Sequence, residues 1–144
     1  MGILKNLKNI LNKDSNFKPY DKNSFSCKCG CGTNNIYEEF IDFMNYLYKE
    51  TDTVYEINSG VRCINHNKKV GGKENSDHIY GKAIDVKTLT IEDRSLVVYY
   101  AFKFGIPRAI VYTDKYFVHL SINENLTCPI LLWNKRGEVY WILT

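Results

Sequence analysis

The chain has 144 residues, which is enough for one domain with a hydrophobic core and too few for two ordinary domains. Hydrophobic residues make up 44% and charged residues 24%, a composition that argues against a disordered protein. The net charge of +3 comes without a dense basic run, which argues against nucleic-acid binding, and no run of about 18 apolar residues predicts a membrane span.

The first residues carry apolar side chains at helical spacing. Ile3, Leu7 and Leu11 lie four residues apart with lysines and asparagines between them, which predicts a short amphipathic helix over residues 1–13. We expect this helix to pack on the domain, and a membrane-surface or partner-binding helix is the alternative. The segment is too polar for the apolar core of a signal peptide, so we expect synthesis in the cytoplasm without one.

Three cysteines alternate in a loop-like segment before the first long helix. The C-x-C-x-C run formed by Cys27, Cys29 and Cys31 suggests a metal knuckle, but no second cysteine pair follows at zinc-finger spacing. We therefore expect small buried thiols, or one thiol that pairs with Cys63 or Cys128. Without a secretion signal, reduced thiols are the default.

Two segments have the periodicity of amphipathic helices. Residues 35–50 carry an apolar stripe, with Asn34 or Asn35 as the expected N-cap. Residues 91–104 form the second expected helix, which begins after Thr90 as N-cap and ends at a glycine.

Short runs rich in β-branched and aromatic residues predict the strands of one sheet. The expected strands are 54–58, 83–86, 109–112 and 116–122. Residues 123–144 would add a C-terminal hairpin extension that turns near Lys135, Arg136 and Gly137. We expect residues 1–144 to form a single domain of the α+β class.

A histidine and an aspartate lie seven residues apart near the middle of the chain. Asp85 lies inside an apolar strand, and His78 lies on the loop before it. A buried carboxylate needs a partner, and a metal ion with an imidazole as its second ligand is one solution. His119, on the open face of the strand 116–122, is the third candidate. Two histidines and one carboxylate, with a fourth position for water, form the ligand count of a catalytic zinc site.

Four motifs around these residues follow one another in a characteristic order. They are Ser59–Arg62 (S-G-x-R), His66–Gly72 (H-N-x-x-V-G-G), Ser76–Asp85 (S-x-H-x-x-G-x-A-x-D) and Val118–His119 (V-H). The series resembles the zinc D-Ala-D-Ala carboxypeptidase and endopeptidase family over roughly residues 20–122. That family shares its fold with the amino-terminal signalling domain of hedgehog proteins.

The resemblance implies both a fold and a site. The implied fold is a central antiparallel sheet with helices packed on one side. The implied ligands of one zinc ion per chain are His78, Asp85 and His119, and Arg62 and Ser76 would contact the peptide or carboxylate of the substrate. The implied reaction is hydrolysis of peptide bonds in peptidoglycan stem peptides, as a D-Ala-D-Ala carboxypeptidase or an endolysin-type endopeptidase.

The general base is the point where the sequence departs from better-known relatives. Those relatives carry a glutamate three residues before the last histidine, and Tyr116 occupies that position here. The nearest carboxylate is Asp114, on an expected turn five residues before His119, and we expect it to act as the base. Many relatives also carry an aspartate two residues after that histidine, where this chain has Ser121. Hedgehog domains likewise have serine there, which leaves open whether this chain is a hydrolase or a binding descendant.

Three functional hypotheses therefore remain. The leading one is a zinc peptidase that acts on the cell wall after release, as a phage endolysin, or as part of a phage particle. A zinc-containing cell-wall-binding module without catalysis is the second, and a structural phage protein with a vestigial site is the third. We expect a monomer, and two nitrogen ligands with one oxygen would also accept manganese or cobalt.

Overall fold

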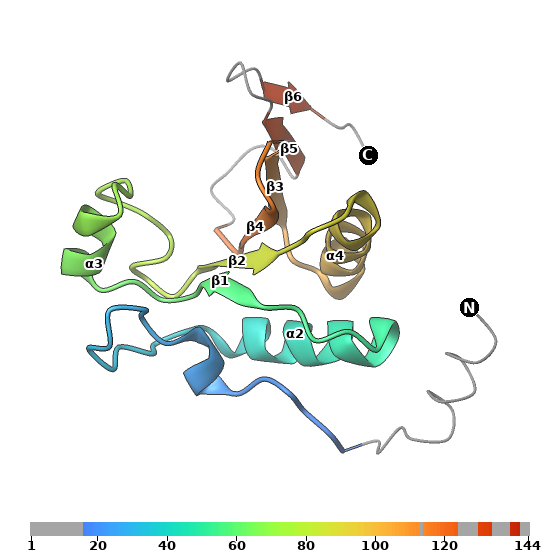
Figure 1. Cartoon of the computed structure of the whole chain (residues 1–144), viewed down its shortest axis with the longest axis horizontal. Coiled ribbons are helices and arrows are strands. Elements are labelled where there is room, and N and C mark those ends of the chain that lie inside the picture. Colours follow the sequence, from blue (N-terminus) through green and yellow to red (C-terminus); the bar gives the residue numbers. More distant parts are fainter. Residues whose placement is uncertain (1–15, 113, 124–129, 134–138, 142–144) are drawn as a thin grey trace.

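The computed structural model describes residues 16–112, 114–123, 130–133 and 139–141 (Figure 1). The expected helix at 1–13, Cys128 and the expected turn at 135–137 lie outside these residues. The elements in chain order are the 3-10 helix η1 (Lys22–Phe25), α2 (Glu38–Thr51), β1 (Ile57–Ser59), α3 (Ile64–Lys69), β2 (Ala83–Lys87), α4 (Ile91–Phe104), β3 (Arg108–Tyr112), β4 (Phe117–Ser121), β5 (Ile130–Trp133) and β6 (Val139–Trp141).

The strands form one sheet with the order β1-β2-β4-β3-β5-β6. The first four strands of that order pair with one another in antiparallel fashion, which confirms the predicted α+β fold with a central antiparallel sheet. β5 pairs in parallel with β3 at the edge of these four strands, and β6 pairs in antiparallel fashion with β5. The C-terminal strand pair thus lies inside the segment 123–144 that was expected to form a hairpin extension.

The helices α2 and α4 cover one face of the sheet (Figure 1). Alternate residues of β2, β4 and β3 are buried against them: Ile84, Val86, Val118, Leu120, Ala109 and Val111. The residues between them, including Asp85 and His119, face the other side of the sheet because side chains alternate along a strand. One face of the sheet is therefore core and the other is available for a site.

The ends of the helices test the predicted caps. At α4 the Thr90 hydroxyl accepts a hydrogen bond from the backbone N–H of Asp93, and Gly105 closes the helix with φ of 106°, so both predicted caps are confirmed. At α2 the predicted asparagine cap is wrong, because the helix begins after Tyr37 without a side-chain cap. Ile36 is buried although it precedes the helix, which made the apolar stripe look longer than the helix is.

A short helix, α3, was not predicted. It lies beyond β1, at the opposite end of the molecule from α4 (Figure 1). Its six residues are too few to show helical periodicity in the sequence. None of the described helices has the length and apolar content needed to cross a membrane.

Candidate active site

The antiparallel pairing of β2 with β4 brings two of the predicted ligands together. Asp85 and His119 are direct partners in the register of these strands, and both face away from the helices. His78 reaches them from the loop before β2, where its backbone carbonyl accepts a hydrogen bond from the N–H of Arg62 at 3.0 Å. Two strands and one anchored loop therefore converge on one point.

The three side chains are in direct contact. His119 Nδ1 lies 2.8 Å from Asp85 Oδ1, and His78 Nε2 lies 3.4 Å from Asp85 Oδ2. The imidazole rings lie 5.1 Å apart between centroids at an interplanar angle of 62°. One ligand atom from each residue falls within 4.8 Å of the other two, a spacing that a single metal ion can bridge.

The donor set fits a metal ion in its protonation as well as its spacing. His78 Nδ1 lies 2.8 Å from the Gly60 carbonyl oxygen, which can only accept, so Nδ1 carries a proton and Nε2 is the ring nitrogen that faces Asp85. Burial alone would raise the pKa of the Asp85 carboxyl, but the hydrogen bonds and charges of His119 and His78 outweigh it and hold that pKa well below its usual range. Asp85 is thus anionic at neutral pH, as a carboxylate that could hold a metal ion must be.

Arg62 is fixed beside this centre by three different acceptors. Its Nε donates to the Ser59 hydroxyl at 3.0 Å, Nη1 to the Asn67 amide oxygen at 3.4 Å, and Nη2 to Asp85 Oδ2 at 3.4 Å. Asn67 is itself 2% exposed, and its amide nitrogen donates to the Lys73 carbonyl at 2.8 Å. The guanidinium is therefore held in place before any substrate arrives.

Ser76 lies at the edge of the same centre, where its hydroxyl accepts a hydrogen bond from the His78 backbone N–H at 3.3 Å. Its neighbour Asp77 is bound by two groups from the end of β4. The Ser121 hydroxyl donates to Asp77 Oδ2 at 2.8 Å, and the Asn123 amide donates to Oδ1 at 3.0 Å. Ser121, which departs from the pattern of many relatives, thus ties the His78 loop to the sheet.

A cavity of about 540 Å³ opens over the centre. Four basic side chains line it together with the predicted ligands: Arg62, Lys73, Arg108 and Lys115. The carboxylates in its lining are Asp77, which Ser121 and Asn123 hold, and Asp85. Among the described lining residues, basic side chains therefore outnumber carboxylates by four to two, which favours an anionic ligand.

The structure places Asp114 on the turn between β3 and β4, where it is exposed. Asp114 is not one of the described residues that line the cavity, although Tyr112 and Lys115 on either side of it do. Tyr112 was missed at the sequence level. Burial and the charge of Asp85 raise the pKa of its phenol.

Sequence reasoning missed the residues that act through their neighbours. The Gly60 carbonyl, Asn67 and Asp77 each orient a predicted site residue or its loop. A polar residue such as Asn67 on a short helix gives no periodic signal, and a backbone carbonyl gives none at all. Only the place of Asn67 inside the H-N-x-x-V-G-G motif pointed to it.

The sequence comparisons agree with this geometry. A family model described as Peptidase M15 matches residues 18–121, well over half of the chain, and the match includes all three predicted metal ligands. Comparison with curated proteins finds no match. The chain belongs to the peptidase M15 family, the metal-dependent family of zinc D-Ala-D-Ala carboxypeptidases.

Proposed function

We propose that the protein is a zinc metallopeptidase that hydrolyses peptide bonds in peptidoglycan stem peptides. The observation that carries this proposal is the convergence of His78, Asp85 and His119 at the floor of a cationic cavity. When bound by these three residues, a zinc ion supplies a water of near-neutral pKa and a Lewis acid for the scissile carbonyl.

The substrate class follows from the charge of the cavity. Stem peptides end in a carboxylate and carry further acidic groups, and the basic lining offers them several partners. Arg62 is the best placed of these, because its planar fork is fixed beside Asp85 and can bind a carboxylate or a peptide carbonyl. Ser76 would contact the peptide from the loop that carries His78.

Proton transfer needs a carboxylate or another base within reach of the attacking water. We propose Asp114 for this role, since the turn that carries it is flanked by two residues of the cavity lining. Action on the cell wall, as a phage lysin, is the setting that we propose for this chemistry.

A second candidate is a zinc-containing module that binds wall peptides without cutting them. The specific observation in its favour is that Asp114 does not line the cavity, while Asp77 already accepts hydrogen bonds from Ser121 and Asn123. Such a module would keep the metal and the cationic cavity but would lack a free base.

Digestion of purified peptidoglycan separates the two candidates. The wild type should release new amine termini, and His78→Ala should abolish the release together with one bound metal ion. His66→Ala is the matched control, because His66 lies on α3 outside the group of predicted ligands. Zinc-loaded wild type that binds stem peptides but releases no amines would refute the peptidase and favour the binding module.

A further inference from the structure

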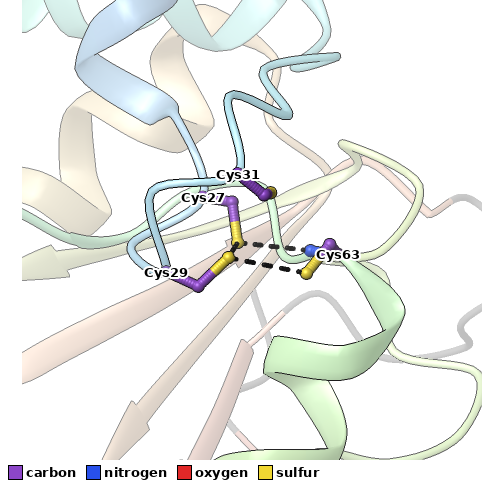
Figure 2. Close-up of side chains that lie close together, drawn as sticks. All are labelled: Cys27, Cys29, Cys31 and Cys63. Carbon is purple, nitrogen blue, oxygen red and sulfur yellow. Dashed lines mark hydrogen bonds between the residues drawn. The ribbon is translucent and has the colours of Figure 1, made fainter.

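Four cysteines gather at a second place in the molecule, away from the histidines. Cys27, Cys29 and Cys31 come from the loop between η1 and α2, and Cys63 comes from the segment between β1 and α3 (Figure 2). Their sulfur atoms all lie within 4.8 Å of one another. The expectation of buried thiols is correct for Cys27 alone, because Cys29 and Cys31 are exposed.

We propose that these four thiolates bind a structural zinc ion, distinct from the His78, Asp85 and His119 centre. The Sγ atoms of Cys27 and Cys29 are 3.5 Å apart, and those of Cys29 and Cys63 are 3.7 Å apart. A tetrahedron with Zn–S bonds of about 2.3 Å has sulfur–sulfur edges of about 3.8 Å. A disulfide bond would need about 2.05 Å, so the spacing matches shared coordination of a metal ion.

The backbone of the loop turns the three alternating cysteines toward one point. Gly30 and Gly32 both have φ of +83°, in the left-handed region that glycine adopts most readily. The loop is closed by a hydrogen bond from the Cys27 N–H to the Thr33 carbonyl at 2.8 Å. C-x-C-x-C without a second cysteine pair gave a weak signal because the fourth ligand, Cys63, lies more than thirty residues further along the chain.

Hydrogen-bond donors surround three of the four sulfurs. The backbone N–H of Cys63 donates to Cys27 Sγ at 3.4 Å, and the backbone N–H of His66 donates to Cys63 Sγ at 3.3 Å. The Thr33 hydroxyl lies 3.1 Å from Cys31 Sγ and can donate to a thiolate there. Such partners orient metal ligands and stabilise their charge.

The site has a structural task in this fold. The twelve residues from 26 to 37 contain neither a helix nor a strand, and a segment of this length needs an additional link to hold one conformation. Through Cys63, the proposed metal ion would connect the segment 26–37 to residues next to the candidate active site. Cys63 follows Arg62 directly, and Val61 is hydrogen-bonded to the Phe25 carbonyl at 2.8 Å. A metal ion here would fix the segment that presents the Gly60 carbonyl and Arg62.

The test is metal analysis of the full chain purified under reducing conditions, without reference to catalysis. The wild type should hold about two zinc ions per chain, and His78→Ala/His119→Ala should keep about one. Cobalt bound to that double variant should show the intense sulfur-to-metal charge-transfer absorption of a tetrathiolate site. Cys29→Ser/Cys63→Ser should lose one metal ion and the absorption. Cys128→Ser, the matched control, should keep both.

The outcomes separate this proposal from the proposed function. Absence of metal from the His78→Ala/His119→Ala variant, a disulfide among the four cysteines, or loss of the second metal in Cys128→Ser would overturn the tetrathiolate site, whatever the activity of the wild type. If the double cysteine variant does not fold, the cobalt spectrum of the histidine variant still decides. An inactive wall assay with this spectrum present would leave the cysteine site standing.

Discussion

Arg62→Lys tests whether the fixed guanidinium fork serves the substrate. Arginine makes three hydrogen bonds to three different residues, and its side chain is only 17% exposed. A lysine ammonium keeps the charge but cannot form the planar fork, so it meets a substrate carboxylate through a single point. The substitution leaves His78, Asp85 and His119 unchanged.

The magnitude follows from the bonds that lysine cannot replace. Loss of one charge-assisted hydrogen bond to the substrate costs about 1.5–3 kcal/mol, which corresponds to a fall of about 10- to 150-fold in kcat/KM. The Asn67 amide oxygen also loses its Arg62 partner, so we expect the free energy of unfolding to fall by about 1 kcal/mol. Bound metal should stay at the wild-type level.

The assay is steady-state hydrolysis of a defined stem peptide, with metal content measured on the same samples. Lys103→Arg is the control, because it makes the reverse exchange in the last turn of α4, at a residue that does not line the cavity. It should change kcat/KM by less than about threefold. Unchanged kcat/KM in Arg62→Lys, or loss of metal, would refute the role of Arg62 as a preorganised substrate contact.

Three further predictions follow from other parts of the fold. In thermal unfolding, Gly81→Ala should destabilise the protein by about 2 kcal/mol or more, because φ is +68° and the new Cβ would collide with a backbone carbonyl. Gly71→Ala is the control: its φ is +75° but the space around it is open, so it should cost only about 1 kcal/mol in the same assay. Asp114→Asn should lower kcat at constant metal content while Asp77→Asn mainly lowers stability, and the reverse pattern in kinetics and melting would make Asp77 the base. Burial, opposed by a weaker backbone hydrogen bond, raises the pKa of Tyr20 from 10 to about 12. The stability that the protonated Tyr20 phenol contributes should therefore be lost as pH rises from about 10 to 12. Tyr20→Phe should flatten that part of the alkaline unfolding curve, and an unchanged curve would contradict the assignment.

Elements with strong local signals were predictable from the sequence. Both ends of the helix at 91–104 were predicted correctly, because Thr90 and Gly105 are specific cap residues at the limits of an amphipathic pattern. The buried strand around Asp85 was predictable because apolar and β-branched residues flank the carboxylate. The convergence of His78, Asp85 and His119 was expected from the loop before the Asp85 strand, from the open strand face of His119 and from the order of the motifs.

Features that depend on tertiary contacts were not predictable in this way. Ile36 is buried by tertiary contacts although it precedes α2, so its apolar side chain led to a predicted helix start that was too early. The parallel pairing of β5 with β3 depends on a chain crossover that local patterns do not encode. Cys63 joins the other cysteines only because the η1 loop packs against the segment after β1, and no spacing rule connects residues so far apart.

The measurement that tests the central claim most directly is hydrolysis of a stem peptide in heavy-oxygen water by zinc-loaded protein. Mass spectrometry should find a single heavy oxygen atom in the new carboxylate of the product, in an amount that rises with metal bound at His78, Asp85 and His119. The same signal should be absent from His78→Ala and present in His66→Ala. Intact peptide after incubation with fully zinc-loaded wild type, or equal cleavage by His78→Ala, would contradict the account.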